Sequence, residues 1–306
     1  MLYLRLLFFI SLYGVFESSV KQECSNNFEE CNDHFDDCTN HPGFMVINCP
    51  LTCGTCHLRN PEVRCAASFL NISTSPILKQ GEIDVLFVNI RDSDQSNVKV
   101  LSQEPWFIQL DDFLSDELVD SLLAQVNGSW ERSSESGEID VTGAGSKLTT
   151  PTRTSSTFWC NNECQYTEVS SKIASLIKEV IHIPTNHFEP IQILKYNVGE
   201  KFVTHHDYSY QELTLPCGPR VITFFLYLSD VEEGGETFFP VLNITITPKK
   251  GRAVVWANTL SRDPSMKDVR MTHEAKAVTT GVKYAANVWV HLFEWERPSL
   301  WACTGS

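Results

Sequence analysis

The residues in this sequence that are best suited to metal chemistry are two adjacent histidines and an aspartate: His205, His206 and Asp207. On an extended strand successive side chains point to opposite faces, so His205 and Asp207 would share a face and His206 would point away. A His-x-Asp pair supplies two of the three ligands of the 2-His-1-carboxylate triad, which holds non-haem Fe(II) with positions left open. A lone His-x-Asp is more often an exposed polar strand end, so this interpretation needs a third ligand elsewhere.

His273 supplies that third ligand, 66 residues after Asp207 (273 − 207), and Lys283 follows ten residues later (283 − 273). Taken alone, each would be interpreted as an ordinary surface residue. Together with the His-x-Asp pair they form the minimum set for an oxygenase that uses 2-oxoglutarate. This keto acid chelates iron through its C1 carboxylate and keto oxygen. Its distal carboxylate is then costly to bury without a paired charge, a role that Lys283 would fill.

Composition and charge limit the possible classes of protein. The 306 residues suffice for one large domain, or for a medium domain with a small module. Hydrophobic residues make up 42% and charged residues 20%, which is typical of a globular protein with a sizeable core. The formal net charge of −14 argues against nucleic acid as a partner and permits a basic polypeptide.

The N-terminus has the pattern of a signal peptide, predicted over residues 1–20. Arg5 precedes an apolar or small run over residues 6–16, which is short of the roughly 20 residues that span a bilayer. An uncleaved anchor is the alternative, because no clean small-x-small cleavage motif follows. No other long apolar run occurs, so we expect no membrane span in the mature chain. The prediction is a protein of the secretory pathway, in the endoplasmic reticulum lumen or secreted, with glycan acceptors at Asn71, Asn127 and Asn243.

Six of the eleven cysteines lie within residues 24–56: Cys24, Cys31, Cys38, Cys49, Cys53 and Cys56. A segment this short cannot bury enough surface to fold without cross-links, so a disulfide module is predicted over residues 21–57. Six cysteines allow 15 pairings, and spacing alone does not choose among them. A zinc site at Cys53-Gly-Thr-Cys56 is the alternative. The oxidising compartment and the lack of a second CxxC argue against it.

This segment resembles an ShK toxin-like domain, through its ending CPLTCGTC and the methionine at position 45. The pairing of that family implies the disulfides Cys24–Cys56, Cys31–Cys49 and Cys38–Cys53. Some members block channels, whereas modules attached to enzymes are more often docking or accessory units. A secreted binding protein that acts through this module is therefore one alternative function.

The rest of the chain predicts an α+β domain after a linker over residues 58–97, in which residues 85–90 could add an edge strand. Helical spacing of apolar residues predicts helices over 115–126, with Ser115 as N-cap, and over 168–180. The Ser-, Thr- and Gly-rich stretch 133–156 is interpreted as a mobile loop, or a lid. Strands are expected over residues 191–196, 221–228, 253–256 and 284–293, forming a sandwich or distorted barrel with helices on one face.

Residues 98–297 resemble the catalytic domain of the prolyl 4-hydroxylase family. The similarity lies in the stretches VKVLSQEPWFIQLDDFLS, RTSSTFW, LKYNVGEKFVTHHD, RVITFFLYLSDVEEGGETFFP, PKKGRAVVW and GVKYAANVWVH, together with His273. The resemblance implies a double-stranded β-helix (jelly-roll) core. It also implies Fe(II), 2-oxoglutarate and O2 as cofactor and co-substrates, with ascorbate to rescue oxidised iron. The expected activity is hydroxylation of peptidyl proline to 4-hydroxyproline, with succinate and CO2 as co-products.

The same resemblance implies the role of each site residue. Fe(II) would be held by His205, Asp207 and His273, with His206 outside the site. Lys283 would pair with the distal carboxylate of 2-oxoglutarate, assisted by the hydroxyls of Tyr196 and Thr237. Substrate contacts are implied for Arg220, Trp289, His291 and Phe202. The last of these stands where the family commonly has a tyrosine, and this puts the substrate preference in doubt.

Some questions remain open at this level. Hydroxylation of a residue other than proline is a second alternative function. A partner subunit is possible but not indicated, because no long helical peptide-binding region precedes the catalytic domain. The loop over residues 208–219 is expected to shape substrate access. Five further cysteines, an odd number, leave at least one without an internal partner, and Cys160–Cys164 is one possible pair among Cys65, Cys160, Cys164, Cys217 and Cys303.

Overall fold

The computed structural model describes residues 24–93, 97–126, 128–139 and 145–305. The predicted signal peptide lies outside this part of the chain, as does Asn127. Among the described residues, none of the helices has the length and apolar character needed to cross a bilayer.

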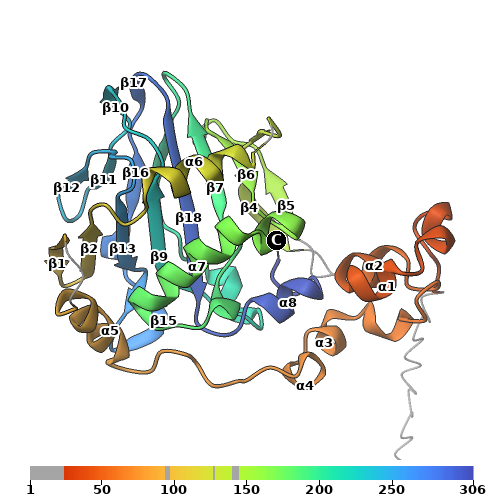
Figure 1. Cartoon of the computed structure of the whole chain (residues 1–306). Helices are drawn as coiled ribbons and strands as arrows, with labels where there is room; N and C mark the ends of the chain where they lie inside the picture. Colours follow the sequence, from red (N-terminus) through yellow and green to blue (C-terminus); the bar gives the residue numbers. More distant parts are fainter. Residues whose placement is uncertain (1–23, 94–96, 127, 140–144, 306) are drawn as a thin grey trace, which may run out of the picture.

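Two facing sheets form the larger body (Figure 1). The strands of the main sheet run in the order β1 (Val98–Gln103), β2 (Trp106–Leu110), β13 (Ala253–Ala257), β9 (Arg220–Tyr227), β18 (Lys283–His291), β7 (Gln192–Tyr196), β6 (Ser156–Trp159) and β3 (Glu131–Arg132). The smaller sheet has the order β12 (Ile244–Ile246), β11 (Thr237–Phe239), β16 (His273–Ala275) and β8 (Phe202–His205). Both sheets are antiparallel throughout, which confirms the expected jelly-roll architecture.

Three short two-stranded pairs complete the strands: β4 (Glu135–Ile139) with β5 (Gly145–Leu148), β10 (Glu233–Gly234) with β17 (Val278–Thr280), and β14 (Thr259–Leu260) with β15 (Asp263–Lys267).

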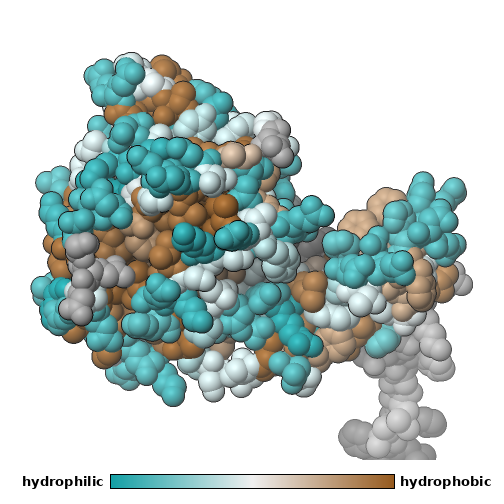
Figure 2. Space-filling view, in the orientation of Figure 1, coloured by the Kyte–Doolittle hydropathy of each residue, from teal (hydrophilic) through white to brown (hydrophobic). Residues whose placement is uncertain are grey.

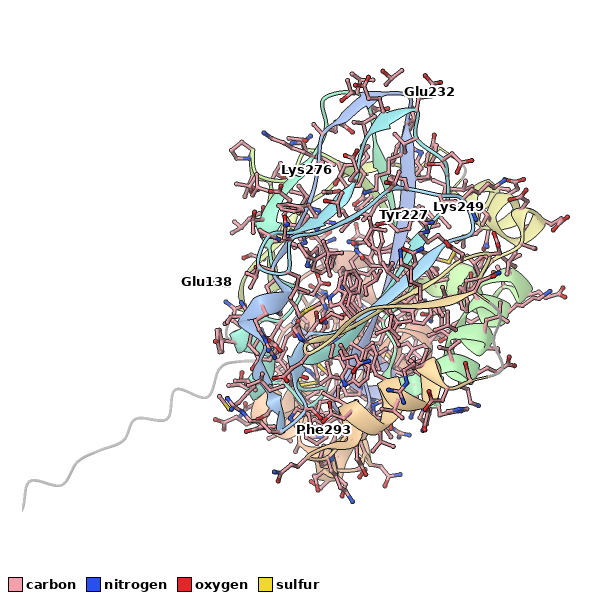
Figure 3. The ribbon with its side chains drawn as sticks, turned by 90° about the vertical axis from the view of Figure 1, so that its left-hand side faces the viewer. Glu138, Tyr227, Glu232, Lys249, Lys276 and Phe293 are labelled. Atoms are coloured by element: carbon pink, nitrogen blue, oxygen red, sulfur yellow. A yellow bond between two sulfur atoms is a disulfide. The ribbon has the colours of Figure 1, made fainter. Side chains whose placement is uncertain are left out.

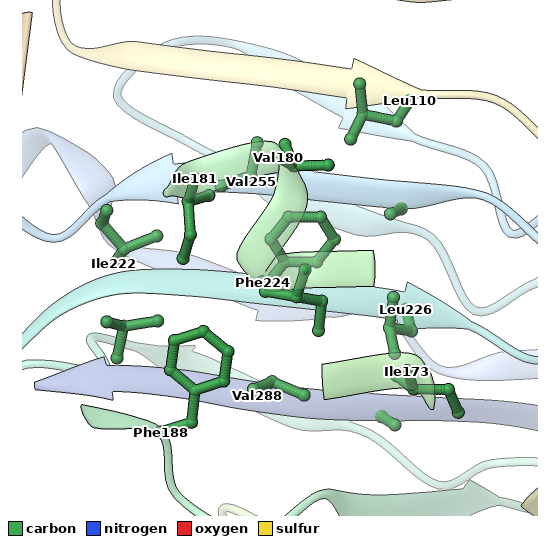
Figure 4. Close-up of a cluster of buried hydrophobic side chains, with 14 of the residues drawn as sticks. Leu110, Ile173, Val180, Ile181, Phe188, Ile222, Phe224, Leu226, Val255 and Val288 are labelled. Atoms are coloured by element: carbon green, nitrogen blue, oxygen red, sulfur yellow. The ribbon is translucent and has the colours of Figure 1, made fainter. Parts of the chain in front are cut away.

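The two predicted helices form as α6 (Asp116–Ala124) and α7 (Glu168–Ile181). Each begins at a hydroxyl cap, since Ser115 accepts a hydrogen bond from the backbone N–H of Leu118 and Thr167 accepts one from Ser170. Both helices pack on the outer face of the main sheet. The resulting core joins α7 to the central strands, as Figure 4 shows for Ile173, Phe224 and Val288.

Strand alternation divides the central strands between two layers. On β9 the even-numbered Ile222, Phe224 and Leu226 face the helices, whereas Phe225 and Tyr227 belong to a second cluster between the two sheets. Figure 3 shows Tyr227 in the interior among the strands. On β7, Gln192 shares its parity with Leu194 and Tyr196 of this inner cluster. On β18, Lys283 and Asn287 share theirs with Ala285, so the space between the sheets is where chemistry can be placed.

Two local predictions were wrong. Residues 85–90 belong to helix α5 (Glu82–Arg91), not to an edge strand. Its buried residues Ile83, Leu86, Phe87 and Ile90 recur every three or four positions, and this helical period packs them against the main-sheet core. The stretch 133–156 contains β4 and β5 and leads into β6, which pairs with β7, so much of the predicted loop is strand. Polar strands of this kind show little apolar alternation.

The disulfide module, described over residues 24–57 and called the front module from here on, has the three disulfides that the resemblance implied: Cys24–Cys56, Cys31–Cys49 and Cys38–Cys53. Around them fold η1 (Glu29–His34), α1 (Asp37–Asn40), α2 (Pro42–Asn48) and η2 (Cys56–Leu58). Cys65–Cys303 and Cys160–Cys164 are also bonded, and Cys217 is a free, buried thiol.

The module is docked on the larger body rather than loosely attached. It projects from the side of that body as a distinct lobe (Figure 2), with α2 in contact with α8 (Glu296–Leu300). The short helices α3 (Pro61–Arg64) and α4 (Ala67–Leu70) follow it. The fully buried Arg64 donates from Nε to the carbonyl of Trp301 (2.9 Å) and from Nη1 to the carbonyl of Leu58 (3.0 Å). One guanidinium therefore joins the end of the module to the C-terminal segment.

Gly43 marks the tightest point of this contact. A Cβ atom at this position would lie 2.7 Å from both Ala302 N and Leu300 O, which are backbone atoms that cannot swing aside. We therefore expect Gly43→Ala to destabilise the docked arrangement by about 1–3 kcal/mol, the usual cost of overpacking.

Limited proteolysis and thermal unfolding of the full chain would check this prediction. The control is Gly54→Ala, because nothing lies within 4 Å of a Cβ at Gly54, although its φ of +64° makes some strain local to the module. Gly43→Ala should speed cleavage between residues 57 and 81, and Gly54→Ala should not. Equal cleavage rates in wild type and Gly43→Ala would contradict the docked arrangement.

Candidate active site

The three predicted ligand residues converge between the sheets. His205 ends β8 and pairs in register with His273, the first residue of β16, so the two rings lie side by side with centroids 4.3 Å apart. The strand stops at His205, and Asp207 reaches the same place from the bend that follows. Its Oδ1 lies 3.9 Å from Nε2 of His205 and 3.7 Å from Nε2 of His273. All three candidate ligand atoms lie within 4.8 Å of one another.

Hydrogen bonds to backbone carbonyls orient both imidazoles. Nδ1 of His205 lies 2.9 Å from the carbonyl of Val203, and Nδ1 of His273 lies 3.0 Å from that of Met271. A carbonyl can only accept, so Nδ1 carries the proton and the lone pair of Nε2 is directed towards Asp207. This is the usual outer arrangement of metal-binding histidines.

The electrostatic state of the triad suits a cation. Burial, and next to it the proximity of His273, lower the pKa of His205 well below its ordinary value, so the ring is neutral at pH 7. Burial alone would raise the pKa of Asp207. The neighbouring His273 and His205 and a hydrogen bond from Thr223 outweigh that effect and lower it to about 2. Two imidazole nitrogens and one ionised carboxylate are the donor set of a facial Fe(II) triad.

A buried chain of hydrogen bonds positions the carboxylate. Thr223 donates to Oδ2 of Asp207 (2.6 Å), and Thr223 in turn accepts from the side-chain amide of Asn258 (2.8 Å). The indole N–H of Trp256 donates to Asn258 (2.9 Å). Oδ1 of Asp207 is thereby left to face the two histidines. This hydrogen-bonded chain could not be predicted from the sequence, because its members lie on three separate segments.

His206 points away from the triad and has a structural contact of its own. Its Nε2 lies 2.9 Å from the carbonyl of Asp268, and its Nδ1 accepts from the backbone N–H of Tyr208 (2.9 Å). Burial lowers its pKa to about 4, so it is a neutral side chain that links two loops.

Lys283 lies at the inner end of the site as a fully buried cation. It opens β18 and pairs with Tyr196 on β7. Its Nζ has no hydrogen-bond partner among the described residues and lies 5.3–5.6 Å from the ring centroids of Tyr196, Phe225 and Tyr227. Burial lowers the pKa of Lys283 to about 7, although Glu236 opposes this shift. An orphaned ammonium group of this kind fits a ligand carboxylate, as 2-oxoglutarate would supply.

The two hydroxyls predicted to assist Lys283 differ in their surroundings. Tyr196 and Thr237 are both almost fully buried and line the same groove as the triad. Thr237 Oγ1 accepts a hydrogen bond from the hydroxyl of Tyr227 (2.7 Å), a neighbour that sequence reasoning missed. Tyr227 thus orients Thr237 and gives Lys283 part of its aromatic surroundings.

The predicted substrate residues form a second charged cluster on the same face of the main sheet. Arg220 donates from Nε and Nη2 to the two carboxylate oxygens of Glu189, and its guanidinium lies 3.8 Å from the ring centroid of Trp289. Nε2 of His291 lies 2.8 Å from the same Glu189. Burial disfavours a charge on His291, but contacts with Cys217 and Glu189 outweigh it and raise its pKa well above the ordinary value.

Glu189 joins this cluster and was missed from the sequence. Burial would raise its pKa, yet Arg220 and His291 lower it to about 2. The carboxylate is therefore ionised and holds two cationic side chains in fixed positions. The only available signal was its place just before a predicted strand, which does not distinguish it from a surface glutamate.

Phe202 lies beside the metal triad. Its ring stacks on that of His205 with centroids 3.6 Å apart. Arg153 forms an isolated β-bridge with Phe202, and its guanidinium lies 4.7 Å from the centroid of the Phe202 ring. Arg153 is buried, and this burial lowers its pKa. It belongs to the stretch RTSSTFW but was not singled out beforehand.

The metal triad, Tyr196 and Thr237 line one groove of about 990 Å³ together with Phe202, Arg153, Arg220, Glu189 and Trp289. The groove continues to α8 and the front module. A small chelating acid and an extended polypeptide can therefore approach the same metal position.

Comparisons with known proteins agree with this geometry. The model of the 2OG-Fe(II) oxygenase superfamily matches residues 191–291. Prolyl 4-hydroxylase 5 of Arabidopsis thaliana is 30% identical over 219 residues, covering 65% of this chain and 72% of that protein. Probable prolyl 4-hydroxylase 8 of the same plant is 29% identical over 218 residues, with the same coverage of 65% and 72%.

Among solved structures, a viral collagen prolyl hydroxylase from Paramecium Bursaria Chlorella virus-1, in complex with 2OG, aligns with 60% of this chain and 95% of its own. The sequence identity is 26% and the TM-score is 0.48.

The class that emerges is an Fe(II)- and 2-oxoglutarate-dependent oxygenase. Within that class, the chain belongs to the prolyl 4-hydroxylase family.

The adjacent histidines provide a direct test of the triad. We expect His205→Ala, Asp207→Ala and His273→Ala each to lose bound Fe(II) and turnover. His206→Ala should keep its iron and most of its activity, at a cost in stability of about 1–3 kcal/mol from two lost hydrogen bonds. Iron stoichiometry and thermal unfolding would check this. An iron-free His206→Ala with an iron-loaded His205→Ala would reverse the assignment.

Lys283 predicts a pH dependence of 2-oxoglutarate binding. Its pKa is about 7 in the free protein, and a bound carboxylate favours the charged form, so binding above pH 7 takes up a proton. The dissociation constant should be flat below about pH 7 and then weaken by up to about tenfold per pH unit. In the free protein the unfolded state binds more protons between pH 7 and 10, so the free energy of unfolding should rise over that range.

Calorimetric titration under anaerobic conditions would measure this, with Lys283→Met as the uncharged control. Lys283→Met should bind about ten- to a hundredfold more weakly and show no pH dependence of this origin, while retaining iron. Lys283→Arg should recover only part of the affinity, because a planar guanidinium needs a differently shaped pocket. Equal binding by all three proteins would remove Lys283 from the site.

Proposed function

We propose that this enzyme hydroxylates C4 of proline residues in polypeptides, with Fe(II) held by His205, Asp207 and His273. The observation that carries the proposal is the buried ammonium group of Lys283, which has no hydrogen-bond partner among the described residues and pairs in register with Tyr196 in the groove of this triad. Such a group matches a dicarboxylic co-substrate. Iron and 2-oxoglutarate, when bound together, use O2 to replace a C–H hydrogen by hydroxyl, with succinate and CO2 as co-products.

The protein's own residues bind, orient and exclude water. His205, His273 and the ionised Asp207 would supply three ligands, and a metal held by three protein ligands would have further positions for the co-substrate. Lys283, with Tyr196 and Thr237, would hold the distal carboxylate of 2-oxoglutarate. The aromatic rings around Lys283 keep water out of this end of the groove.

The Arg220, Glu189 and His291 cluster is assigned to the substrate. Glu189 fixes Arg220, so the remaining N–H groups of this guanidinium can donate to peptide carbonyls with little loss of side-chain entropy. Both ring nitrogens of His291 already have partners, in Glu189 and the carbonyl of Gly218, so His291 positions Glu189. Trp289 lies under Arg220 and offers an aromatic wall, and Phe202 lies beside the metal. An apolar pyrrolidine ring between these two faces would present its ring carbons to the iron.

Several features support a place in the secretory pathway. Five disulfides stabilise the described chain, and such bonds persist in oxidising compartments. The candidate glycan acceptors Asn71 and Asn243 are exposed, with Asn127 outside the described residues. The apolar N-terminal segment fits a signal peptide. Ascorbate is proposed as the reductant that restores iron after turnovers not coupled to a substrate.

Mass spectrometry of a peptide panel tests the function. Proline-rich and collagen-like peptides should gain one oxygen at proline, whereas matched peptides with lysine or asparagine in place of proline should not. A gain on lysine alone would favour the alternative oxygenase function. The absence of 2-oxoglutarate consumption by the iron-loaded protein with every peptide would favour a binding protein.

Glu189→Gln provides a test of the substrate cluster. The amide keeps the shape but loses the charge that holds Arg220 and His291, so KM for the peptide should rise about tenfold or more. Binding of 2-oxoglutarate should be unchanged, because Lys283 is untouched. Glu232→Gln, an exposed carboxylate outside the groove, is the matched control. An unchanged peptide KM in Glu189→Gln would separate this cluster from the substrate.

A further inference from the structure

The groove that contains the metal triad extends beyond the jelly-roll body. Its outer walls come from three segments that are distant in sequence: the front module with His41, Gly43 and Phe44, the short helix η3 (Asn162–Tyr166), and α8 with Leu300. Figure 1 shows α2 of the module next to α8. The outer groove is therefore a composite surface that neither the module nor the oxygenase body has alone.

The module holds its part of the wall rigidly. Gly43 lies against the backbone of residues 300–302, and Arg64 donates hydrogen bonds to the carbonyls of Trp301 (2.9 Å) and Ala302 (3.4 Å). The disulfide Cys65–Cys303 fixes the same two segments covalently. A module that served only as a tether would not need this close contact at the mouth of the active-site groove.

Aromatic and aliphatic side chains stand exposed along this outer part. Phe44 is 56% exposed, Tyr166 69% and Leu300 50%, although each borders a groove where burial would be favourable. Between them lie the side-chain amides of Asn161, Asn162 and Gln165. Glu294, Glu296, Arg297 and Lys147 contribute charges of both signs, so no single sign of charge selects the ligand.

We propose that the front module and α8 form an outer binding site for the substrate polypeptide, which takes a proline-rich segment in extended polyproline II conformation beyond the target proline. The inference rests on the proposed function for the identity of the chain that enters the groove. Continuity of the groove from the triad to Phe44 makes this segment part of the same polypeptide as the target residue.

The chemistry of the walls matches that occupant. A polyproline II segment makes no internal hydrogen bonds, so its carbonyls are free to accept from amide donors such as those of Asn161 and Gln165. Its rings pack flat on exposed aromatic faces, which is how other proline-rich ligands are recognised. The conformation is already extended in the free peptide, so less entropy is lost on binding.

The test compares two substrates on the full-length enzyme. A peptide of about 5 residues spans roughly 15 Å in this conformation and fills only the inner groove, whereas one of about 20 residues spans roughly 60 Å and reaches the module. Wild type should show a lower KM for the long peptide. In Phe44→Ala and in Tyr166→Ala, the ratio of the long-peptide KM to the short-peptide KM should rise about five- to tenfold.

Phe35→Ala is the matched control, because Phe35 is a 65% exposed phenylalanine of the same module that does not line the groove. It should leave the ratio as in wild type. An unchanged ratio in both groove variants would overturn the proposal. Tighter or equal binding of a 20-residue glycine- and serine-rich peptide would overturn the proline-rich occupant. A dimer of the wild type in sedimentation that depends on concentration and is lost in Phe44→Ala would also overturn it, because a second copy of the chain would then occupy the surface.

Fluorescence anisotropy of the labelled long peptide gives a second readout that does not depend on turnover. Weaker binding to Phe44→Ala than to Phe35→Ala would support the outer site even if no peptide were hydroxylated. The missing hydroxylation would then count against the proposed function alone. Equal binding to both variants would count against the outer site while leaving the oxygenase assignment intact.

Discussion

Strand alternation within a sheet that is covered on both faces is the constraint on which this structure depends. The central strands β7, β9, β13 and β18 give one parity of residues to the helices and the other to the space between the sheets. Lys283, Trp289 and His291 are all odd-numbered on β18, so they share the inner face without any further specification. A shift of one residue in register would turn the even-numbered side chains of β18 to the inner face, among them Tyr284, Val288 and Val290. Apolar groups would then fill the site, and the charged side chains would be buried under the helices.

The inner face of the main sheet buries two groups of charged side chains, and burial of a charge costs free energy unless it is paired. The two groups differ in how far the protein itself pairs them. The Glu189 carboxylate neutralises its cationic neighbours, whereas the ammonium group of Lys283 lies near three aromatic rings and has no hydrogen-bond partner among the described residues. The first arrangement is complete and rigid, and it suits the positioning of a large substrate. The second leaves a buried ammonium group without a hydrogen-bonded anion in the described chain, and under the proposed function the distal carboxylate of the co-substrate would supply one.

The front module is a fold of its own and also part of the packing of the larger body. Three internal disulfides make it a small fold in its own right, yet Gly43, Arg64 and Cys65 bind it to the C-terminal segment beside the groove. The helix α5 then inserts Ile83 and Phe87 into the main core. The segment between module and body is therefore part of the packing and does more than connect two domains.

The sequence by itself determined the triad, the cation that follows it, the two amphipathic helices and the main strands, because these depend on local spacing and on periods of 2 and 3.6 residues. It also determined the disulfide module, through cysteine density and a family resemblance. Only the tertiary structure decided the partners of Glu189, the chain from Trp256 to Asp207, the helical state of residues 85–90 and the Cys65–Cys303 bond. Each of these joins segments up to 238 residues apart, or depends on which surface a short apolar stretch meets. The local spacing of residues does not predict such contacts, because they depend on the packing of the whole chain.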